Sequence, residues 1–247
     1  MKTLKITLFL FFITSLLYSQ DAKEIIQKAN DLTMGKTAKG TYTMVLVRPD
    51  WKREVTMKIW SRGVDYYMIL ITAPAREKGQ VFMKRYNEMW NWVPSINKMI
   101  KIPPSMMSQS WMGSDFTNDD LLKESSIVKD YDHAIIGSDS VDNFDCYKIQ
   151  LIPKPDAAVV WGKIIMWIAK KDFYELKAEY YDEFGELINK QFGSEIKDYG
   201  DRKLPAKFVM VPMDKEGNQT ILRMDEMAFN KNIPESFFSQ QNMKKIR

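Results

Sequence analysis

Three stretches of this chain alternate apolar and polar side chains with a period of two residues. They cover residues 54–59, 146–151 and 174–180, and in the first of them Val55 and Met57 flank a polar residue. A period of two is typical of a strand with one buried and one solvated face, the usual arrangement in antiparallel sheets. The chain is therefore predicted to fold around an antiparallel β-sheet.

Two further stretches, residues 65–71 and 163–168, are apolar at nearly every position, which predicts strands that are covered on both sides. Glycine-containing turn sequences separate the strand candidates. These turns are centred on Gly63, Gly185, Gly200 and Gly217. In total we expect about ten or eleven strands and two or three helices, a mainly β (α+β) fold built on a single curved sheet.

The N-terminus has the pattern of a secretory signal peptide. Lys2 and Lys5 precede a mostly apolar run over residues 6–17, and polar residues follow. A basic start, roughly 7–15 apolar residues and a polar exit define such a leader, and the run is short for a bilayer span of about 20 residues. We expect cleavage after Ser19 or Gln20 and a periplasmic location. An uncleaved membrane anchor is the alternative.

With residues 1–20 as the signal peptide, residues 21–247 are expected to form one domain, since no repeat or linker divides them. This domain begins with a predicted amphipathic helix, started by Asp21 and Glu24 in a capping-box-like arrangement. The apolar stripe of this helix consists of Ile25, Ile26, Ala29 and Leu32, and its end is expected between Gly35 and Gly40.

Residues 103–124 interrupt the strand pattern. Pro103 and Pro104 end a strand, and a segment rich in Met and aromatic residues follows without a clean period. Thr117 and Asp120 have the spacing of a helix start. We expect this insert to lie as a loop or short helix over the open side of the sheet.

Side chains that usually carry enzyme chemistry are scarce. The sequence holds one histidine, His133, and one cysteine, Cys146. A His/Cys metal cluster cannot form, no cofactor is expected, and we expect a solvated histidine and an inert thiol. The acidic residues near the second helix start are expected to face its dipole. The formal charge is only +4, which argues against a nucleic-acid partner. An enzyme is not expected.

Large apolar side chains gather between residues 89 and 116, in the strands before the insert and in the insert itself. Seventeen methionines and seven tryptophans give the chain an adaptable apolar inventory that suits binding of varied apolar ligands. Packing in the core is the competing role for each of them. The candidate cavity and lid residues are Trp90, Trp92, Met99, Met106, Met107, Trp111, Met112 and Phe116.

Two segments resemble the outer-membrane lipoprotein-sorting (LolA-like) family. One is Ser110-Trp-Met-Gly-Ser-Asp-Phe116, followed by Asn118-Asp-Asp-Leu121, and the other is the C-terminal run from Phe229 to Phe238. The resemblance covers essentially the whole mature chain. It implies an incomplete barrel of about eleven strands, closed by helices over an apolar cavity. No arginine of this chain could be assigned to the gating arginine in the lid of the lipoprotein chaperones.

The resemblance also implies a function. A LolA-like protein would be a periplasmic carrier for the acyl chains of lipoproteins or another lipid, moving toward the outer membrane. Its partners would be an inner-membrane transporter as donor and an outer-membrane acceptor, and it would act as a monomer. A lipid- or lipoprotein-sensing receptor domain that acts through a protein partner is the alternative. A lipid-modifying enzyme is the least supported, because we find no convergent polar site.

Overall fold

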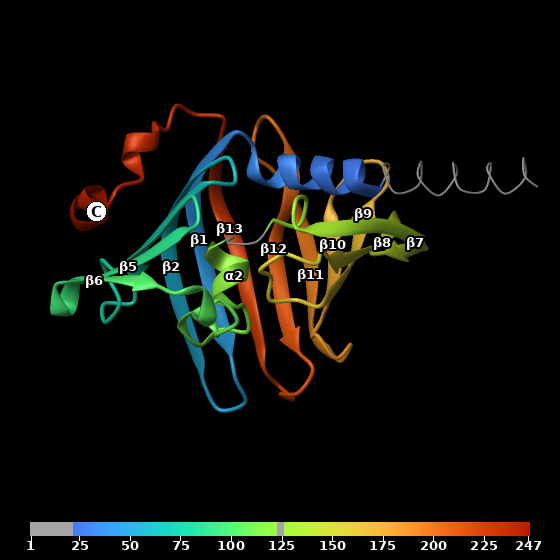
Figure 1. Ribbon diagram of the computed structural model, residues 1–247, viewed down its shortest axis with the longest axis horizontal. Coiled ribbons are helices and arrows are strands. Elements are labelled where there is room, and N and C mark those ends of the chain that lie inside the picture. Colours follow the sequence, from blue (N-terminus) through green and yellow to red (C-terminus); the bar gives the residue numbers. More distant parts are fainter. Residues whose placement is uncertain (1–21, 123–125) are drawn as a thin grey trace, which may run out of the picture.

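The computed structural model describes residues 22–122 and 126–247 (Figure 1). Residues 22–34 form the N-terminal helix, and the predicted leader and Asp21 lie outside the described residues. The strands are β1 (Thr37–Val47), β2 (Lys52–Arg62), β3 (Tyr66–Ala73), β4 (Val81–Arg85), β5 (Glu88–Val93), β6 (Lys98–Ile102), β7 (Tyr131–Val141), β8 (Phe144–Pro153), β9 (Lys163–Ala169), β10 (Glu175–Tyr181), β11 (Leu187–Asp198), β12 (Lys203–Pro212) and β13 (Gln219–Phe229). The short helices are η1 (Pro94–Ile96), η2 (Pro104–Met106), η3 (Trp111–Gly113), α2 (Asn118–Leu122), η4 (Glu235–Phe237) and α3 (Gln240–Lys245).

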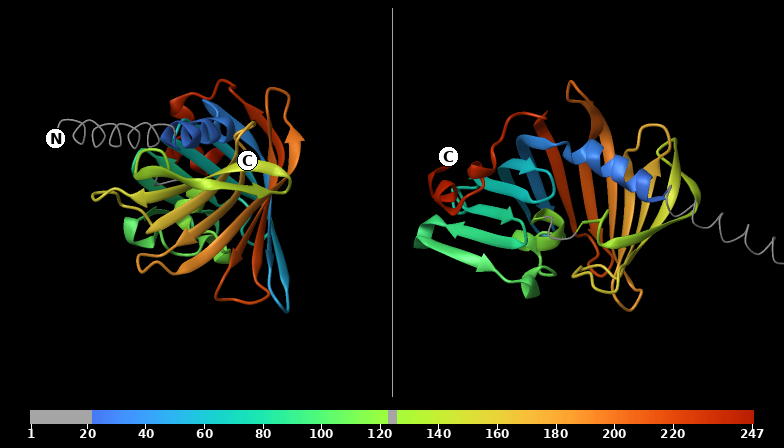
Figure 2. Two further views of the ribbon diagram at one scale, coloured as in Figure 1. Left: turned by 90° about the vertical axis from the view of Figure 1, so that its right-hand side faces the viewer. Right: turned by 45° about the horizontal axis from the view of Figure 1, so that its top comes forward.

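Within the described ranges, all thirteen strands belong to one antiparallel sheet, whose order is β6-β5-β4-β3-β2-β1-β13-β12-β11-β10-β9-β8-β7. The sheet curves but does not close, because β6 and β7 are edge strands and do not pair with each other (Figure 2). These two edges are consecutive in the chain. The insert between them, with η2, η3 and α2, therefore has to span the open side. This confirms the predicted incomplete barrel, with thirteen strands instead of about eleven.

The alternation predicted the faces of β2 correctly, but in β10 a bulge between Glu175 and Lys177 places Leu176 in a different core cluster from Ala178. In β2, Val55, Met57 and Ile59 are buried in the largest core cluster, on the concave side. The strand predicted to be covered on both sides, β3, sends Ile69 into this same cluster. Its Met68 packs on the convex side against the C-terminal segment, residues 230–247. The four predicted glycine turns also join strands, and each of these glycines has a positive φ.

Two helices follow their sequence signals. The N-terminal helix buries Ile25, Ile26 and Ala29 against the inner faces of β8, β9 and β10. Gly35 follows it with a φ of +61°, a conformation in which glycine is favoured. Gly40, in contrast, lies within β1, where a side chain would collide with the Glu226 carbonyl. No helix within the described ranges is long and apolar enough to cross a bilayer.

His133 corrects one expectation, because it is not solvated. It lies on the edge strand β7 and is only 5% exposed. Its Nε2 is 2.6 Å from the Ile127 carbonyl oxygen, which can only accept, so Nε2 carries a proton and donates. Burial lowers the pKa of His133 below its ordinary value, and this outweighs the opposing hydrogen bond to Ile127. The free Cys146 is buried in β8, where burial raises the pKa of its thiol.

Stability should consequently fall as the pH drops below about 6.5, the ordinary pKa of histidine in an unfolded chain. A lowered pKa in the folded state means that the unfolded chain binds the proton more readily, so the contribution of His133 is complete above this range and lost below it. Lys23 and Lys154 also disfavour the charged ring, whereas Asp132 favours it. Chemical denaturation between about pH 5 and 7 should show a weaker pH dependence for His133→Gln, which keeps a donor for Ile127. An unchanged pH dependence would contradict this role.

Candidate functional site

A cavity lies between the concave face of the sheet, the N-terminal helix and the end of the insert. It has two neighbouring lobes of about 140 and 160 Å³, which we call the helix lobe and the sheet lobe. Both lobes are lined from all three sides, by Thr33 and Met34 of the helix, Asp120 of α2 and Met166 of β9. The cavity therefore exists only because the helix and the insert cover the curved sheet.

Apolar and aromatic side chains make up most of the wall. The sheet lobe is lined in addition by the apolar and aromatic residues Tyr42, Tyr67, Phe116, Leu121, Ile127, Ile164, Tyr180, Phe208, Leu222 and Met224. Tyr42 and Tyr180 are only half-buried, because part of each ring borders this cavity. Burial is nevertheless the main cause that raises the pKa of both hydroxyls well above the ordinary value. These rings lie away from bulk water.

The polar groups of the cavity carry negative charge or donate hydrogen bonds. Asp119, Asp120 and Glu175 line the helix lobe, and Glu175 accepts a hydrogen bond from Gln191 at 2.6 Å. The indole of Trp161 donates to Asp120 at 3.0 Å. Among the described residues, no Lys, Arg or His lines either lobe. The cavity thus combines an apolar wall with an acidic patch, in which Asp120 and Glu175 line both lobes and Asp119 lines the helix lobe.

α2 positions Asp119 and Asp120 of this acidic patch. The Thr117 hydroxyl accepts a hydrogen bond from the Asp120 backbone N–H at 3.1 Å, and the Asp120 carboxylate accepts one from the Thr117 N–H at 2.8 Å. This reciprocal pair is the capping box expected from the sequence. It fixes the first turn of α2 so that Leu121 and Leu122 enter the core. Within the described ranges, no group of acidic, histidine or cysteine side chains is arranged to hold a metal ion.

A buried ion pair anchors the insert to the sheet. Asp115 contacts the Arg48 guanidinium at 3.0 Å, and these side chains are only 3% and 11% exposed. Thr220 of β13 donates to the same carboxylate at 2.6 Å, and Asn189 of β11 donates to the Asp115 carbonyl at 3.2 Å. Arg48 also donates to the Gly113 carbonyl at 2.9 Å. The Gly-Ser-Asp-Phe segment is thus the point at which the insert is fixed across β1, β11 and β13.

Comparison with known proteins agrees with this architecture. A protein-family model described as "-like: Uncharacterized protein" matches residues 63–245, which is more than half of the chain. The fold resembles that of a DUF1329 family protein from Desulfovibrio piger, with a TM-score of 0.83 and 20% identity over 92% of this chain and 99% of the other. It also resembles a putative outer membrane lipoprotein-sorting protein domain from Vibrio parahaemolyticus, with a TM-score of 0.81, 21% identity and the same coverage.

A LolA superfamily protein from Nitrosomonas europaea has a TM-score of 0.77 and 22% identity, over 89% of this chain and 98% of the other. The chain belongs to the family whose model matches residues 63–245, and it has a LolA-like fold. At these identities the solved structures establish the LolA-like fold alone. No sequence among the curated proteins matches this chain.

The predicted site residues lie in two different parts of the structure. Phe116 lines the sheet lobe. Met107 and Trp111 are buried beneath the insert in the largest core cluster, Met112 packs against it, and Met106 is 37% exposed. Here the insert contributes to the core as well as covering the cavity.

Trp90, Trp92 and Met99 lie on the convex face instead, where they pack with the C-terminal segment. The reason is the strand period: in β5, Met89 points to the concave core and its neighbours Trp90 and Trp92 point away from it. They therefore do not belong to the cavity.

Sequence reasoning did not identify the cavity residues of the N-terminal helix and of β9 to β13. For Glu175 the alternation even indicated the solvated face, together with Lys177 and Glu179; a bulge between Glu175 and Lys177 turns Glu175 toward the cavity.

Proposed function

We propose that this protein is a periplasmic carrier that binds an apolar chain, such as the acyl chain of a lipoprotein or another lipid, in the two-lobed cavity. The observation that carries the proposal is a cavity with a mainly apolar wall, covered by a helix and an insert, inside a LolA-like sheet. Each buried methylene contributes about 0.8 kcal/mol, so ten would contribute about 8 kcal/mol before the ordering costs of association. Such binding would be useful and still reversible.

The size of the cavity indicates that a long ligand could enter only if the cavity widens. Each lobe is similar to an engineered cavity of about 150 Å³ that holds one benzene molecule. A long chain therefore needs more room than the two lobes offer, and we propose that the N-terminal helix or the insert moves outward as it enters. The predicted leader supports a periplasmic location for this carrier, and transfer toward an outer-membrane acceptor belongs to the same proposal.

The acidic patch of the cavity indicates what kind of polar group the ligand carries. Asp119, Asp120 and Glu175 would repel a carboxylate, and in a poorly solvated cavity this repulsion is stronger than in water. A hydroxyl, an amine or an amide N–H would instead donate to the carboxylates. We therefore propose an apolar chain whose polar end donates hydrogen bonds, in preference to a free fatty acid.

Native mass spectrometry of protein purified gently from cell envelopes should show a bound molecule of lipid mass. A titration then tests the polar end, with two fluorescent probes of equal chain length that end in a hydroxyl or a carboxylate. We expect the alcohol to bind about tenfold more tightly, a difference of roughly 1.4 kcal/mol. Equal affinities would contradict the role proposed for the acidic patch, and no binding of either probe would contradict the carrier function.

A further inference from the structure

A second depression lies on the convex face of the sheet, separate from the cavity. It has a volume of about 740 Å³ and lies between α3, β2, the β3–β4 loop and η1; we call it the outer groove. The C-terminal segment forms one of its sides, because Phe238 and Met243 are fully buried against the convex face of β3 to β5. This packing places α3, with its exposed Lys244, beside the groove.

Four cations line the outer groove: Lys58, Lys78, Lys244 and Arg247. No acidic residue is among its lining, and none of the four forms an ion pair with an Asp or Glu side chain within the described ranges. Neighbouring cations differ in this respect. Arg53 pairs with Glu77 at 3.2 Å and Lys101 pairs with Glu88 at 2.7 Å. The groove therefore presents a concentration of positive charge that side-chain carboxylates do not neutralise, and of these cations Lys58 donates to the Arg247 main-chain oxygen at 3.4 Å.

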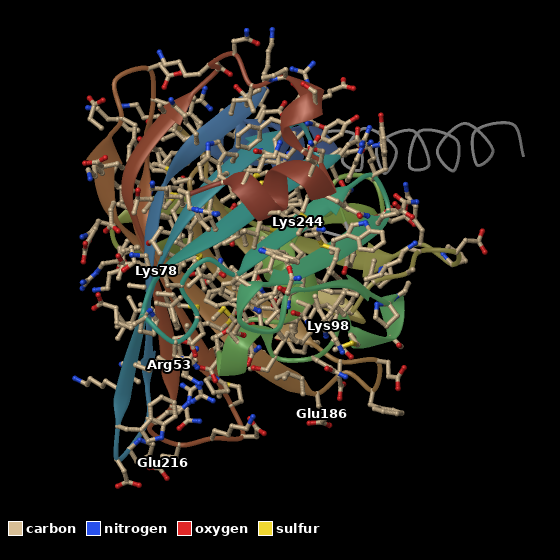
Figure 3. The ribbon with its side chains drawn as sticks, turned by 90° about the vertical axis from the view of Figure 1, so that its left-hand side faces the viewer. Arg53, Lys78, Lys98, Glu186, Glu216 and Lys244 are labelled. Carbon is tan, nitrogen blue, oxygen red and sulfur yellow. The ribbon has the colours of Figure 1, made fainter. Side chains whose placement is uncertain are left out.

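The floor of the outer groove is apolar. Leu70, Trp92 and Ile246 contribute to it, and the Lys244 ammonium lies 5.3 Å from the centre of the Trp92 ring. At its rim, Pro94 begins η1, which ends in Ile96, a side chain that is 56% exposed. Figure 3 shows Lys78, Lys98 and Lys244 together on this end of the molecule. Cations around an apolar floor match the chemistry of an anionic amphiphile.

We propose that the outer groove docks the protein onto an anionic lipid bilayer, with phosphate-bearing headgroups between its four cations and Ile96 at the acyl boundary. Its volume lies in the range of sites for single small molecules. An acidic protein partner would instead need a surface of about 800 Å² on each side. Electrostatic attraction together with a limited apolar contact is typical of reversible binding to membrane surfaces. The inference goes beyond the carrier proposal, because it concerns the opposite face of the sheet.

Flotation with vesicles tests the proposal. The mature protein is mixed with vesicles of phosphatidylcholine that contain phosphatidylglycerol, and separately with vesicles of phosphatidylcholine alone. We expect binding to the first kind only, lost as salt is raised. The double variant Lys78→Glu/Lys244→Glu should bind at least about tenfold more weakly. The matched control is Lys171→Glu/Lys203→Glu, which changes the net charge equally at exposed positions outside the groove and should bind like the wild type.

Three results would overturn the proposal. One is that the wild type binds both kinds of vesicle equally. The same holds if the wild type binds neither kind, which is the result expected if the groove binds an acidic protein instead of a bilayer. Another is an equal loss of binding in the groove variant and in its control, since this would indicate net charge alone. A third is wild-type binding by the groove variant. Titration of both variants with the fluorescent alcohol separates the two proposals, because the outer groove should not affect the cavity.

Discussion

Replacing Asp115 with alanine is expected to lower the free energy of unfolding by about 3–5 kcal/mol. The substitution leaves the Arg48 guanidinium, which is 11% exposed, without its carboxylate. The Thr220 hydroxyl loses its acceptor in the same step. Urea denaturation, followed by tryptophan fluorescence, measures the change. Because the pair fixes the insert, the variant should also release a bound probe faster.

Two controls separate burial from ion pairing as such. The Lys101–Glu88 pair is shorter, at 2.7 Å, but both side chains are 54% exposed, so Glu88→Ala should change stability little. The double variant Arg48→Met/Asp115→Leu removes both charges and should recover much of the loss, because no uncompensated charge remains buried. If Asp115→Ala is as mild as Glu88→Ala, the pair does not anchor the insert.

Local patterns were sufficient to predict the strands and most turns. The alternation around Val55 and Met57 follows directly from the pleat of a strand, and Gly63 and Gly185 allow the positive φ that their turns require. The capping box of Thr117 and Asp120 is equally local. Each of these signals depends on residues a few positions apart, so it can be recognised in the sequence without knowledge of the fold.

The site depends on relations that no local pattern contains. Alternation shows that Met89 and Trp90 face opposite sides, but it does not say which side is concave. The C-terminal segment decides this for β5 by covering its other face. Arg48 and Asp115 are 67 residues apart, so their pairing depends on how the insert crosses the sheet. The sequence predicted an apolar cavity beneath the insert, but the residues that line it could be assigned only once the strand order was known.

A phenylalanine at position 33 is expected to fill the cavity from the N-terminal helix and to prevent ligand binding. Thr33 lines both lobes and is half-buried, and a lobe of about 160 Å³ has room for one phenyl ring. Excluding even three methylenes of a ligand removes about 2.4 kcal/mol, roughly fiftyfold in affinity. The folded state should keep or gain stability, because the ring fills a void. Titration with the fluorescent alcohol and thermal unfolding measure the two effects.

The chain offers matched controls for this substitution. Gln27→Phe introduces the same ring on the exposed side of the same helix, and Thr33→Val keeps the cavity open, so both should bind like the wild type. Leu222→Phe approaches the sheet lobe from the opposite wall and should weaken binding independently of any effect on the helix. Wild-type affinity in both Thr33→Phe and Leu222→Phe would place the ligand outside this cavity. Loss of affinity in both, with folding intact, would identify the space between the helix and the sheet as the binding site.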